Sequence, residues 1–160
     1  MLKFLCKPLA LALSALLFST TIYAQSDLIK QQSCEGNPYQ LTIDSLKQFY
    51  ATQGYSVLKE ASMTMESQYE MPIVVPMNQG TWYQFIFIGE PTSKLYEVRM
   101  FDWSERQVVY KKNQWGDIDG NIISYSYIPK GTEYHMIKPV QVNKTKKKLC
   151  GYVLLLKKTQ

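Results

Sequence analysis

Thr81-Trp-Tyr-Gln-Phe-Ile-Phe-Ile88 is the stretch that decides the fold, because its apolar side chains alternate over two faces. Tyr83, Phe85 and Phe87 share one face, and the tryptophan and both isoleucines share the other. Apolar residues on both faces are typical of a central strand that is covered on each side. The stretch therefore predicts a sheet with one layer on either face.

Period-two alternation continues on both sides of this stretch. Before it, strands are expected over 55–65 and 69–75, and Ala61, Met63 and Met65 share one face of the first. After it, strands are expected over 95–102, 107–111, 121–128, 133–138 and 150–156. Short strands separated by turns at such regular spacing are typical of an antiparallel sandwich or barrel.

One helix is expected, over about 42–53. Its apolar residues recur at helical spacing, as Ile43, Leu46, Phe49 and Tyr50. Thr42 is expected to cap its start, and Gly54 to end it. With no strand–helix–strand rhythm, the pattern predicts an all-β domain with one short N-terminal helix.

The first 24 residues have the three parts of a secretory signal peptide. Lys3 and Lys7 give a basic start, an apolar run over 8–18 follows, and Ala24 is the small residue at the exit. The apolar run is shorter than the roughly 20 residues that a spanning helix needs, which favours cleavage over an uncleaved anchor. Residues 25–160 are therefore expected to form one periplasmic or secreted domain.

Charge excludes one class of partner. Removal of the two signal lysines lowers the formal net charge from +5 to +3, which is too small to favour nucleic-acid binding. No later segment is long and apolar enough to span a bilayer.

Two cysteines remain after the signal peptide, Cys34 and Cys150. In an exported chain, such a pair predicts a disulfide, and the alternative is two buried free thiols. Together with the single histidine they are too few and too badly spaced for a zinc site.

Four stretches resemble the bacterial pre-peptidase C-terminal family, namely 80–87, 96–102, 128–136 and 150–156. They match an aromatic strand after a turn glycine, a strand ending in aspartate, a Pro-x-Gly-x-x-Tyr corner and a final Gly-Tyr strand. The resemblance covers roughly residues 55–157 and implies a jelly-roll-like β-sandwich of about eight strands from a secreted protein. Several members bind calcium or carbohydrate, and the helix and the cysteine pair of this chain depart from the family pattern.

Alternating polar residues suggest a calcium loop at Asp117, Asp119 and Asn121. An EF-hand would place glycine at the sixth position and glutamate at the twelfth, whereas Gly120 comes too early and position 128 is isoleucine. Asp-Gly-Asn is also ordinary hairpin chemistry. Calcium is thus an alternative, and no other cofactor is expected.

Two tryptophans in expected loops, Trp103 and Trp115, are the candidate ligand-binding residues, because an exposed indole can stack on a sugar ring. The alternative is that tyrosine and tryptophan fill the core of a sandwich. A basic run at Lys144 and 146–148 would suit acidic glycans or lipid headgroups, or form a solvated hairpin tip.

No catalytic set is found in the sequence. His135 is expected to face outward, and neither a Gly-x-Ser-x-Gly nor a His-Glu-x-x-His motif is present. The carboxylates Asp44, Glu60 and Glu97 are scattered along the chain. The chain is therefore expected to be no enzyme, with a weak hydrolase using a carboxylate pair as the remote alternative.

These observations predict an exported, non-catalytic binding or accessory module of the bacterial cell envelope. A glycan or an envelope protein is the expected partner. The alternative within the same class is a carbohydrate- or calcium-binding β-sandwich.

Overall fold

The computed structural model describes residues 33–36, 38–114 and 120–159. In these residues one helix and eight strands follow each other along the chain: α1 Gln40–Thr52, β1 Tyr55–Glu66, β2 Ile73–Met77, β3 Tyr83–Ile88, β4 Leu95–Phe101, β5 Gln107–Gln114, β6 Ile122–Tyr127, β7 Glu133–Val142 and β8 Lys148–Lys158. The predicted signal peptide lies outside the described residues.

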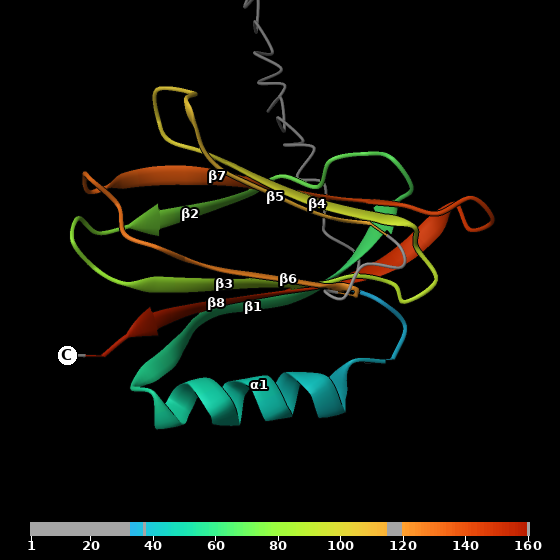
Figure 1. The fold of residues 1–160 in the computed structure, drawn as a ribbon, viewed down its shortest axis with the longest axis horizontal. Coiled ribbons are helices and arrows are strands. Elements are labelled where there is room, and N and C mark those ends of the chain that lie inside the picture. Colours follow the sequence, from blue (N-terminus) through green and yellow to red (C-terminus); the bar gives the residue numbers. More distant parts are fainter. Residues whose placement is uncertain (1–32, 37, 115–119, 160) are drawn as a thin grey trace, which may run out of the picture.

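The strands form two four-stranded antiparallel sheets packed face to face (Figure 1). Sheet A has the order β1-β8-β3-β6, and sheet B has the order β2-β7-β4-β5. This is the strand order of a jelly roll, with the chain crossing repeatedly from one sheet to the other. The predicted fold class, an all-β jelly-roll-like sandwich with one N-terminal helix, is confirmed.

Strand β3 is the centre of sheet A, as its sequence predicts. It lies between β8 and β6, and all six of its residues are buried. Tyr83, Phe85 and Phe87 face the core between the sheets, while Ile86 and Ile88 face α1 on the other side. Because both faces are covered, this strand carries apolar or aromatic residues at every position except Gln84.

The core between the sheets consists of the inward side chains of both layers. It is built from Met63, Met65, Ile73, Val75, Met77, Tyr83, Phe85, Phe87, Tyr96, Val98, Met100, Ile123, Tyr125, Ile137, Val153 and Leu155. Burial of such a set supplies most of the free energy of folding. The predicted shared face of Met63 and Met65 is confirmed.

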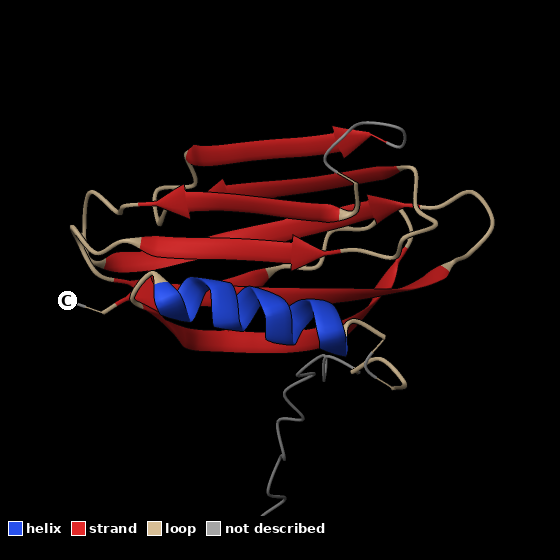
Figure 2. Cartoon of the chain, turned by 60° about the horizontal axis from the view of Figure 1, so that its bottom comes forward, coloured by secondary structure: helices blue, strands red, loops and turns tan. Residues whose placement is uncertain are grey.

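Helix α1 lies across the outer face of sheet A (Figure 2). Ile43 is its one fully buried residue, and Phe49, expected on the same apolar face, is 56% exposed. Its end agrees with the sequence, because Gly54 adopts the left-handed conformation at φ 79°. As the only helix of the described residues, α1 is not long and apolar enough to cross a membrane.

The expected cap at Thr42 is wrong. The helix begins at Gln40, and no side chain caps it. Tyr39 precedes the first turn with its ring buried, and its hydroxyl donates to the Cys150 carbonyl at 2.9 Å. Tertiary contacts of this ring, rather than a capping side chain, thus fix where the helix starts.

A disulfide joins Cys34 to Cys150, as predicted, with 5.7 Å between their Cα atoms. It fastens the segment before α1 to strand β8. The Tyr39 hydroxyl bond to the Cys150 carbonyl lies at the same place, so two links hold the start of the helix to sheet A.

The expectation that His135 faces outward is wrong. The residue pairs with Val75 in the register of β2 and β7, and this register points both side chains into the core. His135 is fully buried, and its Nε2 lies 3.2 Å from the Tyr127 hydroxyl.

Strand β7 is longer than expected and continues past Lys138. Pro139 is tolerated within it because this residue lies beyond the end of β2 and has a strand partner in β4 alone.

Candidate functional site

The outer face of sheet B is the candidate binding surface, because none of the described elements covers it (Figure 1). Strand β4 shows how the sequence divides the two faces. Tyr96, Val98 and Met100 point into the core, and Glu97 and Arg99 point outward. The same alternation in β2, β5 and β7 places a mixed set of aromatic, apolar and charged side chains on this face.

Trp103 and Tyr134 form the aromatic end of this face. Trp103 is 71% exposed and Tyr134 is 53% exposed. Their ring centroids lie 6.1 Å apart, with an angle of 50° between the planes. Exposed rings at this spacing offer two neighbouring apolar surfaces to a ligand.

Trp103 lies in a turn that is held by hydrogen bonds to the preceding residue. The carboxylate of the preceding Asp102 accepts bonds from the backbone amides of Ser104 and Arg106 and from Arg106 Nε, at 2.8–3.0 Å. Burial raises the pKa of this carboxyl, but the donors of Arg106 and Ser104 outweigh it and hold the pKa below its ordinary range. An ionised Asp102 therefore fixes the loop that carries the indole.

Apolar side chains continue the surface from the aromatic end across three strands. Val74 in β2 lies opposite Met136 in β7, which lies opposite Phe101 in β4. Val74 is 48% exposed and Met136 is 39% exposed. Lys138 extends over the Phe101 ring, with its Nζ 5.2 Å from the centroid. The apolar strip is thus continuous with the charged half of the face.

Ion pairs make up the charged half. Arg99 bonds Glu70 at 3.1 Å and Glu97 at 2.8 Å, and Lys138 bonds Glu70 at 3.0 Å. Tyr110 donates to Glu97 at 3.2 Å. Each charge here has a partner of opposite sign, so this half offers many hydrogen-bonding groups but little net charge.

The remaining predicted site residues are only partly described. Trp115, Asp117 and Asp119 lie outside the described residues. The side-chain amide of Asn121 donates to the Gly89 carbonyl at 2.7 Å. Within the described part of the chain, no three histidine, cysteine, aspartate or glutamate side chains gather in a way that could hold a metal. The calcium interpretation stays a prediction.

The three carboxylates weighed for acid–base chemistry are held by separate partners. Asp44 accepts from Gln40 on the helix, and Glu97 belongs to the ion pairs of sheet B. Glu60 bonds Lys47 and Tyr152. The Lys47 bond, followed by that from Tyr152, lowers the pKa of the Glu60 carboxyl. None of these contacts brings one of the three against another.

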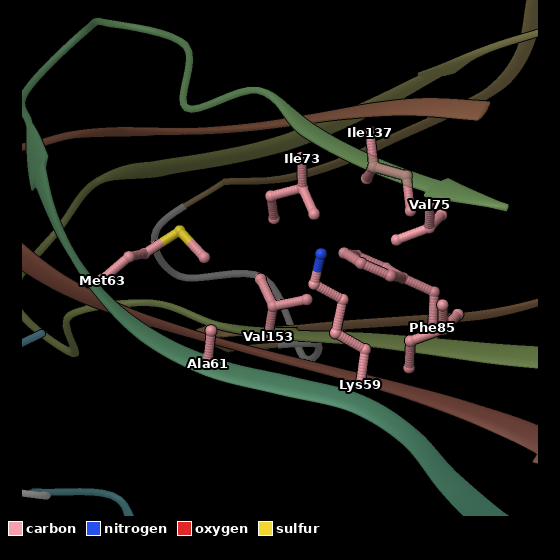
Figure 3. A pocket seen from close by; sticks show the side chains of 9 residues that line it. Lys59, Ala61, Met63, Ile73, Val75, Phe85, Ile137 and Val153 are labelled. Carbon is pink, nitrogen blue, oxygen red and sulfur yellow. The ribbon is translucent and has the colours of Figure 1, made fainter. Parts of the chain in front are cut away.

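Between the sheets, beside edge strands β1 and β2, there is a small apolar cavity (Figure 3). Its lining includes Met63, Ile73, Val75 and Phe85, and its volume of about 10 Å³ has room for one water molecule at most. Lys59 points into it from β1, and its Nζ lies 3.5 Å from the Val74 carbonyl. An inward lysine on an edge strand protects that edge against pairing with another chain, so the cavity has a structural explanation.

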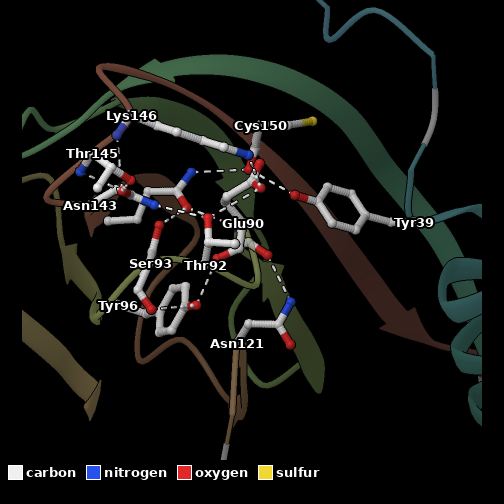
Figure 4. A network of polar contacts seen from close by, with 12 residues as sticks. Tyr39, Glu90, Thr92, Ser93, Tyr96, Asn121, Asn143, Thr145, Lys146 and Cys150 are labelled. Carbon is white, nitrogen blue, oxygen red and sulfur yellow. Dashed lines mark hydrogen bonds and ion pairs between the residues drawn. The ribbon is translucent and has the colours of Figure 1, made fainter. Parts of the chain in front are cut away.

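A polar network lies around Glu90, Ser93 and Cys150 (Figure 4). Gln141 joins two of these residues, Glu90 and Cys150. The side chain is fully buried; its Oε1 accepts from the Glu90 amide at 2.8 Å, and its Nε2 donates to the Cys150 carbonyl at 3.1 Å. Tyr96 donates to the carbonyls of Glu90 and Ser93. These bonds satisfy buried polar groups and hold the loop after β3, which indicates a structural role.

The basic run forms the loop between β7 and β8. The Asn143 side-chain oxygen accepts from the amides of Thr145 and Lys146 and shapes the turn. Lys146 pairs with Glu90 at 2.8 Å, and Lys144, Lys147 and Lys148 are exposed. This arrangement fits the solvated hairpin tip weighed from the sequence.

Sequence reasoning proposed Trp103 as a ligand-binding residue but not the other residues of the face around it. Assigning Tyr134, Phe101 and Met136 to this face requires knowing that β4 pairs with β7, and a single sequence does not reveal that pairing. The sequence did contain one indication. Glu97 and Arg99 point outward, and the period-two alternation of the same strand also places Phe101 on the outer face.

No family model matches the chain, and no curated protein matches it. Among solved structures, the chain is similar to one described as "CBM4 structure and function", at 12% identity and a TM-score of 0.42, over 66% of this chain and 79% of that one. It is also similar to the K1 cleaved adhesin domain of Lys-gingipain from Porphyromonas gingivalis W83, at 12% identity and a TM-score of 0.39, over 62% and 75%.

A third similar structure is a family two carbohydrate esterase from Cellvibrio japonicus, at 12% identity and a TM-score of 0.39. The match spans 67% of this chain but only 31% of the esterase. Similarities at this level assign no function. The predicted fold is present, and membership of the pre-peptidase C-terminal family stays a prediction.

Proposed function

We propose that this protein is an exported, non-catalytic module that binds an extended, uncharged glycan on the outer face of sheet B. The observation that carries the proposal is the exposed pair of Trp103 and Tyr134 on a sheet face that the described elements leave bare. Two aromatic rings can stack on the apolar faces of successive sugar units.

The neighbouring groups support an uncharged ligand. The ion pairs of Arg99 and Lys138 with Glu70 and Glu97 leave little net charge to attract an anion. Their remaining donors and acceptors suit sugar hydroxyls, and a surface that extends over β2, β7 and β4 suits a long chain rather than a small molecule.

Export is the second part of the proposal. The predicted signal peptide over 1–24 and the Cys34–Cys150 disulfide agree with an oxidising compartment. We place the mature protein in the periplasm or outside the cell. The separate partners of Asp44, Glu60 and Glu97 support a binding role without catalysis.

The test is binding of the exported protein to an array of neutral and charged polysaccharides, followed by calorimetry with the best neutral ligand. Trp103→Ala and Tyr134→Ala are each expected to weaken binding at least tenfold, which corresponds to about 1.4 kcal/mol. Phe49→Ala is the matched control, because Phe49 is an equally exposed ring on α1, across the molecule.

Two outcomes would overturn the proposal. One is the absence of binding to any neutral polysaccharide, particularly if an envelope protein is instead captured through the same face. The other is release of reducing sugar ends from a bound polysaccharide that is lost in Glu97→Gln, because that would make the protein a hydrolase.

A further inference from the structure

A second groove lies on the other sheet, at the end where β1 begins and β8 finishes. It has a volume of about 780 Å³ and is lined mainly by Ser56, Thr81, Trp82, Lys157, Lys158 and Thr159. The groove is separate from the outer face of sheet B, so an inference about it does not depend on the proposed glycan face.

The end of the helix explains why this groove is open. Trp82, Ile86 and Ile88 lie on the outer side of the same chain segment, but α1 covers only the two isoleucines. Trp82 is 49% exposed. Its carbonyl accepts from the Lys158 amide at 2.9 Å, which extends the pairing of β3 with β8 by one step. The indole is therefore exposed on a fixed backbone.

Lys158 lies between two aromatic rings. Its Nζ is 5.9 Å from the centroid of Trp82 and 5.9 Å from that of Tyr55. Cation–π attraction at this distance is weak, and it holds the ammonium group beside the indole without neutralising it.

Among the residues that the structure describes, the positive charge of the groove has no acidic partner. No aspartate or glutamate among them lines the groove, and neither Lys157 nor Lys158 forms an ion pair with them. On sheet B, by contrast, Lys138 is paired with Glu70. A concave site that holds the ammonium group of Lys158 beside an indole attracts an anion.

We propose that this groove binds a carboxylate-bearing sugar unit, such as a hexuronate within an acidic polysaccharide. The apolar face of the pyranose stacks on Trp82 while its carboxylate pairs with Lys158. Lys157, the preceding residue of β8, points to the opposite face of the strand. Thr81 lies in the same lining, and Ser56 beside it donates its hydroxyl to the Lys157 carbonyl at 3.5 Å. An aromatic ring next to the Lys158 ammonium group selects a ligand that is both ring-shaped and anionic.

The test is isothermal titration calorimetry of the exported protein with tetragalacturonate. Its methyl ester is the matched neutral ligand, because it keeps the rings and removes the charge. The acid is expected to bind at least tenfold more tightly than the ester, and its affinity is expected to fall as sodium chloride is raised.

Variants separate this groove from other surfaces. Trp82→Ala is expected to weaken binding of tetragalacturonate at least tenfold, and Lys158→Gln at least fivefold, with partial recovery in Lys158→Arg. Lys147→Gln, in the exposed β7–β8 loop, and Trp103→Ala, on sheet B, are expected to leave the affinity unchanged. Should Trp82→Ala fail to fold by its melting curve, the lysine variants decide.

Three results would overturn the inference. Equal affinity for acid and ester would remove the role of the carboxylate, and full affinity in Lys158→Gln would remove the role of the ammonium group. Inorganic phosphate that displaces the sugar with equal affinity would reveal a general anion site without sugar recognition. Because Trp103→Ala tests the other face, failure of either proposal is read independently of the other.

Discussion

The two outer faces of the sandwich contrast sharply, since α1 covers much of sheet A and none of the described elements covers sheet B. The covered face is apolar at Ile86, Ile88, Leu154 and Leu156. The bare face alternates exposed rings with paired charges, as at Trp103 and Arg99. The comparison indicates that a sheet face without a covering helix carries paired charges beside its exposed apolar groups, and that such a face is open to a ligand.

Removing the disulfide is expected to have the largest effect on this contrast, because the bond fastens the segment leading into α1. The two cysteines are 116 residues apart, and Cys34→Ser with Cys150→Ser is expected to lower the free energy of unfolding by about 3–5 kcal/mol. Urea unfolding measures the change, and wild-type protein in reductant is the control. A loss below about 1 kcal/mol would contradict this anchoring role.

The covered face is expected to depend on one helical side chain. Ile43 is 1% exposed, so Ile43→Ala is expected to cost about 2–4 kcal/mol. Leu41→Ala, two residues away and 85% exposed, is the matched control and is expected to change stability by less than about 0.5 kcal/mol. Equal effects in the two variants would mean that α1 does not pack on sheet A as described.

Acid is expected to weaken the covered face by a smaller amount. The pKa of Glu60 is lowered by Lys47 and then by Tyr152, so its carboxylate stabilises the fold above its ordinary value of 4.5 and this contribution is lost as pH falls further. Because the side chain is 38% exposed, Glu60→Gln is expected to cost less than about 1 kcal/mol at pH 7 and a smaller amount at pH 3. Unfolding curves at both pH values measure it, and a cost that is larger at pH 3 would refute the sign.

The bare face is expected to contribute least to stability. Trp103→Ala and Val74→Ala remove exposed side chains and are each expected to change the free energy of unfolding by less than about 0.5 kcal/mol. Ile137→Ala, adjacent in β7 but facing the core, is the contrasting variant, with an expected cost of about 2–5 kcal/mol. Thermal and urea unfolding compare them. A severe loss in Trp103→Ala would show that the indole supports the fold rather than a ligand.

Much of the fold could be predicted because its signals are local. The apolar alternation of β3 identified a strand covered on both sides, and Gly54 marked the end of the helix. The disulfide was predicted because the chain is expected to be exported and because two cysteines remain after the signal peptide. What failed depended on distant partners: Tyr39 fixes the helix start through Cys150, and the β2–β7 register buries His135. A single sequence states neither of these pairings.

The candidate site was predicted less well for the same reason. Trp103 was singled out because it lies in an expected loop, but its neighbour Tyr134 is 31 positions later in the sequence and meets it only through the sheet. Trp82 was assigned to a covered strand, and its exposure follows from where α1 ends. How far α1 extends over sheet A depends on tertiary packing, and the alternation of apolar residues within one strand does not show it.

The order of sheet A also determines when the protein can fold. Strand β1 pairs with β8 alone, and β8 separates it from β3. While the chain is being synthesised, the first strand therefore has no partner until the last strand has emerged, and α1 lacks Leu154 and Leu156 beneath it. Pairing of such distant segments slows folding and leaves an incomplete chain open to aggregation. Packing of the helix, formation of the disulfide and pairing of the first strand therefore all require β8.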